Sequence, residues 1–115
     1  MAHNTTVFEV VLLLPNEERS VHVGVEEHIW DAAFTAGVVL PALCHQGRCL
    51  TCAGRLESTG EVDQSDSVNY YPEDRESGFV LLCMGKPGSS LRIQTHQQSE
   101  MRKHRIQKRL SAPYS

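Results

Sequence analysis

Four cysteines carry most of the distinctive chemistry of this 115-residue chain. Three of them fall within nine residues, with four and then two residues between successive cysteines, and the fourth follows after thirty more. They are Cys44, Cys49, Cys52 and Cys83. Four kinds of site could use these thiols: two disulfides, a zinc site, a redox-active Cys-x-x-Cys pair, or an iron–sulfur cluster.

The spacing favours an iron–sulfur cluster. Disulfides need an oxidising compartment, and residues 1–6 lack the cationic start of an export signal. Zinc ribbons usually present two short Cys-x2–4-Cys pairs, whereas three of the cysteines here fall in one stretch and the fourth stands alone. A thioredoxin-type pair opens a helix after a strand, whereas Cys49 and Cys52 follow a long loop that already contains a cysteine. A three-cysteine loop with a distant fourth cysteine is instead the ligand pattern of a plant-type [2Fe–2S] cluster. Structural zinc stays the chief alternative, because four thiolates also make a good zinc site.

Length and composition indicate one domain with an ordinary core, since 40% of the residues are hydrophobic and 22% are charged. The longest apolar runs, residues 10–14 and 79–84, are of strand length. They are far too short to cross a membrane, so we expect a cytoplasmic protein without membrane insertion. No catalytic triad, carboxylate pair or glycine-rich nucleotide loop stands at a defined spacing, so no enzyme activity is expected.

Hydrophobic periodicity predicts an α+β domain with a mixed sheet. Residues 43–52 show no period and are expected to form a loop, and Gly47 lets the backbone approach closely there. One helix is expected over residues 27–36, where apolar side chains repeat at helical spacing before Gly37. The expected strands cover residues 7–14, 21–25, 55–57, 79–84 and 91–95.

Charge is distributed unevenly along the chain. Residues 1–100 carry six basic and fourteen acidic side chains, a formal charge of −8, whereas residues 101–115 carry five basic side chains and no acid. The acidic body does not favour nucleic acid. We therefore divide the chain into a domain at 1–100 and a basic C-terminal extension at 101–115. This extension is expected to be either a short amphipathic helix or a disordered tail.

Several stretches of the sequence resemble plant and cyanobacterial [2Fe–2S] ferredoxins, in the same order and at nearly the same spacing. They are residues 29–33, 40–41, 44–54, 62–66, 78–83 and 93–96. The resemblance implies a β-grasp (ubiquitin-like) fold, in which one main helix crosses a mixed sheet and the cluster-binding loop lies at one end. It also implies one [2Fe–2S] cluster held by Cys44, Cys49, Cys52 and Cys83, with Cys44 and Cys49 on the iron nearer the surface.

The resemblance further implies a one-electron carrier, expected as a monomer. It would take electrons from a reductase or photosystem and deliver them to acceptors such as oxygenases, cytochromes P450, desaturases or biosynthetic reductases. A cluster-based redox sensor and a zinc-binding interaction domain are the alternatives. The family's acidic docking runs are diluted here at residues 69–74 and 95–100. The basic extension is therefore expected to modulate partner choice and not to be needed for holding the cluster.

Overall fold

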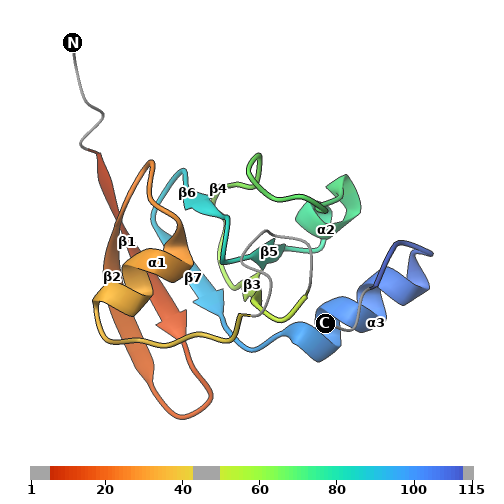
Figure 1. Ribbon diagram of the computed structural model, residues 1–115, viewed down its shortest axis with the longest axis horizontal. Helices are drawn as coiled ribbons and strands as arrows, with labels where there is room; N and C mark the ends of the chain where they lie inside the picture. The colour runs from red at the N-terminus through yellow and green to blue at the C-terminus, as the bar shows by residue number, and fades with distance from the viewer. Residues whose placement is uncertain (1–5, 43–49, 113–115) are drawn as a thin grey trace.

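The computed structural model describes residues 6–42 and 50–112, and its centre is a five-stranded mixed sheet (Figure 1). The strand order is β2-β1-β7-β3-β5, and only the β1–β7 pair is parallel. The strands are β1 (Val7–Leu13), β2 (Glu18–Gly24), β3 (Ala53–Leu56), β5 (Phe79–Leu81) and β7 (Leu91–Gln94). Strands β4 (Val62–Asp63) and β6 (Lys86–Pro87) form a second, two-stranded sheet.

Helix α1 (Ile29–Thr35) crosses the sheet and closes the main core. Its buried side chains, Ile29, Ala32 and Ala33, repeat at helical spacing. They pack against the inward-facing residues of β1 and β2, of which Val10 and Val23 are fully buried. Alternation on the strands and a 3.6-residue period on the helix meet in one core, as the sequence predicts. One main helix crossing a mixed sheet is the arrangement expected of a β-grasp fold.

Of two further helices, the first was not expected from the sequence and the second was one of the two alternatives for the C-terminal extension. Helix α2 (Pro72–Glu76) follows Tyr71, and helix α3 (Gln98–Gln107) follows β7. Figure 1 shows α3 at the end of the molecule opposite α1 and the β1–β2 hairpin. The domain boundary expected at residue 100 falls inside α3, because this helix begins before the basic segment and packs on the rest of the chain. Of the two alternatives for the extension, residues 101–107 adopt the helix.

Helix length gives no sign of a membrane span in the described part of the chain. Within residues 6–42 and 50–112, no helix is both long enough and apolar enough to cross a bilayer.

Strands β3 and β7 approach each other closely at Gly54. A Cβ atom placed on this residue would lie 2.7 Å from Ile93 Cγ2 and 3.2 Å from the Gln94 carbonyl oxygen. Carbon atoms in contact are normally about 3.5–4.0 Å apart, so a side chain there requires the strands to move. The absent side chain thus sets the spacing of the strand that follows Cys52.

Asp66 links His28, the residue before α1, to Lys86 in strand β6 of the small sheet. Its Oδ2 atom lies 2.9 Å from His28 Nε2 and 3.1 Å from Lys86 Nζ. Hydrogen bonds from His28 and then from Lys86 lower the pKa of this carboxyl group below 3.8. The folded state therefore favours the ionised carboxylate, and this exposed contact stabilises the fold only while Asp66 is charged.

We expect Gly54→Ala to lower the free energy of unfolding by about 1–3 kcal/mol, because the added methyl group overpacks the β3–β7 contact. Urea denaturation of the holoprotein measures the change. Gly24→Ala is the control, since its Cβ would come within 3.1 Å of only the flexible end of the Glu27 side chain. Equal effects of the two substitutions would contradict a special constraint at Gly54.

We expect Asp66→Asn to reduce stability at neutral pH and to make the remaining stability less sensitive to acid. The difference from the parent should be constant above about pH 5 and shrink as the pH falls through 3.8 and then the lowered folded pKa. Urea titrations at several pH values measure it. The control is Glu61→Gln, at an exposed carboxylate without an ion pair among the described residues, and it should leave the pH profile of stability unchanged. If Asp66→Asn has the parental pH profile, the Asp66 contacts do not stabilise the fold through its charge.

Candidate metal centre

The pairing of β3 with β5 brings two of the four cysteines together. Cys52 directly precedes β3, and Cys83 follows the end of β5 by two residues. The strands pair antiparallel with Ala53 opposite Leu81. The Leu82 amide donates to the Cys52 carbonyl at 3.2 Å, which extends the pairing to the cysteines themselves. Residues distant in sequence thereby reach one place at the end of the sheet.

The two thiols face each other. Cys52 Sγ and Cys83 Sγ lie 3.2 Å apart, and both residues are 2% exposed. A disulfide bond is about 2.05 Å long, so this separation shows that Cys52 and Cys83 are not joined to each other by a disulfide. Thiolates on one tetrahedral metal ion with bonds of about 2.3 Å stand about 3.8 Å apart. A widening of roughly half an ångström would let Cys52 and Cys83 bind the same ion, so this donor pair fits an iron of the cluster.

The other two predicted ligands, Cys44 and Cys49, lie outside the described residues. Within residues 6–42 and 50–112, no group of three or more histidine, cysteine or acidic side chains is arranged to hold a metal ion. The described half of the predicted ligand set is therefore the Cys52–Cys83 pair.

An apolar shell surrounds this thiol pair. Its buried members, beside the cysteines, are Leu50, Ala53, Phe79, Leu81 and Met101. Such a shell keeps water from sulfur atoms and lowers the local dielectric. A cluster that becomes more negative on reduction is then harder to reduce, so the shell acts to lower its potential.

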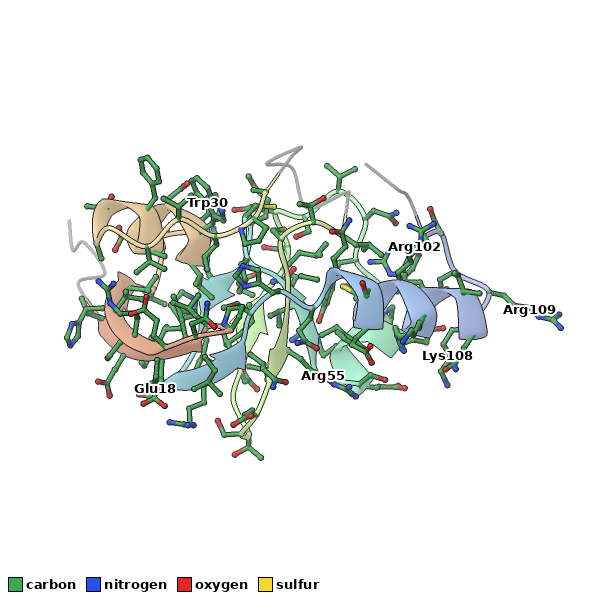
Figure 2. The ribbon with its side chains drawn as sticks, turned by 90° about the horizontal axis from the view of Figure 1, so that it is seen from below. Glu18, Trp30, Arg55, Arg102, Lys108 and Arg109 are labelled. Atoms are coloured by element: carbon green, nitrogen blue, oxygen red, sulfur yellow. The ribbon has the colours of Figure 1, made fainter. Side chains whose placement is uncertain are left out.

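Helix α1 fixes the approach to Cys83. The Trp30 amide donates to the Leu82 carbonyl at 2.9 Å, and the Ile29 amide donates to the Gly85 carbonyl at 2.8 Å. The Trp30 indole Nε1 also donates to the Leu40 carbonyl at 2.8 Å, just before the expected cluster loop. The half-buried Trp30, labelled in Figure 2, thus packs between the main core and the cysteine shell.

Tyr70 packs against the cysteine shell. Its hydroxyl donates to the Phe79 carbonyl at 2.5 Å, and burial raises its pKa to about 12. Proton transfer by this phenol at neutral pH is therefore disfavoured. Its role here is to hold β5, which leads to Cys83.

Sequence reasoning missed three residues near the site. Met101 is fully buried in the cysteine shell, and Asp74 and Arg105 are both completely buried beside it, joined as an ion pair. The sequence places Asp74 in a diluted acidic run and Arg105 in the basic extension, which predicts that both are exposed. Position in the sequence gave no sign of their burial; the only available signal was the spacing of Met101 and Arg105, four residues apart on one helix face.

Comparison with known proteins places this geometry in a family. Residues 14–88 match the family described as "2Fe-2S iron-sulfur cluster binding domain". The chain is 38% identical over 94 residues to ferredoxin-2 of Synechococcus sp., which covers 82% of this chain and 89% of that protein. This match favours a cluster over structural zinc at the four cysteines.

Solved structures show the same architecture. The crystal structure of Pectocin M2 aligns with a TM-score of 0.70 at 27% identity, over 90% of this chain and 41% of that one. The cytochrome P450 reductase of Amycolatopsis aligns with a TM-score of 0.59 at 28% identity, over 74% of this chain and 25% of that one. This chain thus spans less than half of either solved protein. It belongs to the plant- and cyanobacterial-type [2Fe–2S] ferredoxin family and is a one-electron carrier, not an enzyme, with one [2Fe–2S] cluster.

Proposed function

We propose that Cys44, Cys49, Cys52 and Cys83 are the four ligands of the cluster. The observation that carries this proposal is the 3.2 Å separation of the buried Cys52 and Cys83 sulfur atoms. Two irons need two thiolates each, so the Cys52–Cys83 pair serves one iron, and Cys44 with Cys49 serves the other. The cluster supplies a single electron-accepting centre when bound. The protein contributes four deprotonated thiols and a shell that excludes water from one side.

We also propose a redox partner for this carrier that presents an acidic surface. The outer side of α3 and its C-terminal end carry exposed cations, with Lys103 on the helix and Lys108 and Arg109 following it. Figure 2 shows Lys108 and Arg109 at the end of the molecule opposite Glu18. Exposed cations of this kind can orient an acidic partner during diffusional encounter.

A reductase is the electron donor we propose, and an oxygenase-type enzyme the acceptor. Support comes from the likeness to the cytochrome P450 reductase of Amycolatopsis, in which the aligned region is only a quarter of the chain. The proposed ligands all lie before residue 100, and we propose that the exposed cations of the basic segment select partners.

We expect Cys83→Ser to lose most of its iron and visible absorption, because a serine hydroxyl is a poorer ligand than a thiolate for iron of this kind. Iron analysis and the visible spectrum of the purified protein measure both losses. Met84→Leu, a conservative change at the adjacent residue, should retain two irons per chain. Two irons and a parental spectrum in Cys83→Ser would refute the ligand set, and a colourless parent holding one zinc ion would refute the cluster.

We expect the double substitution Lys108→Gln and Arg109→Gln to lower the rate of electron transfer about 2–10-fold at low salt, with a reductase whose docking surface is acidic. The reason is that opposite charges on two partners raise their association rate. Stopped-flow reduction at increasing ionic strength measures it, and the rates should converge as salt screens the charges. The control, Arg19→Gln with Arg92→Gln, removes two cations from the sheet. Faster transfer in the first variant would show that the partner instead binds the acidic surface.

A further inference from the structure

We propose that helix α3 is a strap over the cysteine shell, in which Met101 is a positioning residue for Cys52 and Cys83 and Arg105 is the anchor. This inference rests on the proposed ligand set. It replaces the expectation that the whole segment 101–115 is dispensable for the cluster.

The anchor is a buried ion pair in which each of the three guanidinium nitrogens has at least one acceptor. Arg105 Nε lies 3.0 and 3.1 Å from the two carboxylate oxygens of Asp74, and Nη2 lies 2.9 Å from Oδ2. Nη2 also donates to the Asn69 carbonyl and Nη1 to the Ser111 carbonyl, each at 2.9 Å. The group stacks 4.7 Å from the Tyr71 ring centre. A buried charge pair offsets its desolvation only when the geometry is good and further hydrogen bonds are made, so these contacts fix the position of α3.

Asp74 connects this anchor to the rest of the domain. Its Oδ2 accepts a hydrogen bond from the Tyr71 amide at 2.9 Å and so fixes the start of α2. His104 Nε2 lies 3.1 Å from Asp74 Oδ1 but outside hydrogen-bond geometry, and the His104 ring lies 5.1 Å from that of Phe79. One buried carboxylate therefore ties α2 and α3 together beside β5.

Met101 lies one helical turn before Arg105 and on the same face of α3. Met101 is fully buried in the cysteine shell, the group of side chains that also contains Cys52 and Cys83. At the start of the helix, the Gln97 amide donates to the carbonyl of Ala53, the residue after Cys52, at 3.0 Å. The strap is thus attached on both sides of Met101: by the backbone next to Cys52, and by Arg105 to Asp74.

Two consequences follow for a bound cluster. A fixed apolar side chain at position 101 keeps water from the protein side of the thiolates, which disfavours the more negative reduced form. The same cover slows attack by chelators on the iron held there. Met101 thereby lowers the reduction potential and prolongs retention of the cluster, without itself being a ligand.

The test compares Met101→Gln with Met101→Leu and with Ile106→Gln, which makes a similar polar change at a position of α3 that is 59% exposed. At a poise where the parent is half reduced, Met101→Gln should raise the ratio of reduced to oxidised protein at least about threefold. That change equals about 28 mV, from 59 mV per tenfold for a one-electron couple. Its cluster should also be lost to a chelator several-fold faster. Met101→Leu and Ile106→Gln should both keep the parental ratio of reduced to oxidised protein and the parental rate of cluster loss to the chelator.

Arg105→Lys keeps the charge but loses the planar fork, so it should shorten cluster retention in the same direction as Met101→Gln. If Met101→Gln assembles no cluster, Met101→Ala provides the same potential and chelation measurements, with water admitted to the vacated volume. A parental potential and retention in the folded Met101 variant would overturn the strap. Retention of two irons by Cys83→Ser would instead overturn the ligand set, so the two failures are distinguishable.

Discussion

The antiparallel pairing of β3 with β5 is the constraint on which the cluster end of the molecule depends. It brings Cys52 and Cys83, which are 31 positions apart, to a sulfur separation of 3.2 Å. Both neighbours of this strand pair support it: β7 packs against Gly54 on one side, and the amides of α1 bind the carbonyls around Cys83. A displacement of either strand by one residue would turn one thiol to the opposite face.

Two packed groups of side chains stabilise the fold, and they have different functions. The larger lies between α1 and the β1–β2–β7 part of the sheet and resembles the core of any small α+β domain. The smaller surrounds the thiols and includes Met101 from the far end of the chain. Trp30 contacts both groups, so the structural core and the environment of the proposed ligands are mechanically continuous. Because cores are close-packed, a disturbance in one is felt in the other.

The charge pattern separates into an internal and an external part. Asp74 and Arg105 contribute to the acidic and basic counts of the sequence, yet neither is exposed, and they neutralise each other inside the protein. Lys103, Lys108 and Arg109 on the same C-terminal segment remain at the surface. One short segment therefore combines an inward face that stabilises the domain with an outward face suited to an acidic partner.

The sequence by itself determined the chemistry and the main layers of this protein. Cysteine spacing indicates the cluster because ligands on one loop must follow the local geometry of the metal centre. The hydrophobic periods of β1, β2 and α1 indicate these elements because each period reflects contacts that repeat along one element. Only the tertiary structure decided the places of α2 and α3, the burial of Met101, and the pairing of Asp74 with Arg105. Charged side chains look alike in a sequence whether they are solvated or buried. The difference arises from which distant segments pack together and exclude water, and no local pattern encodes that exclusion.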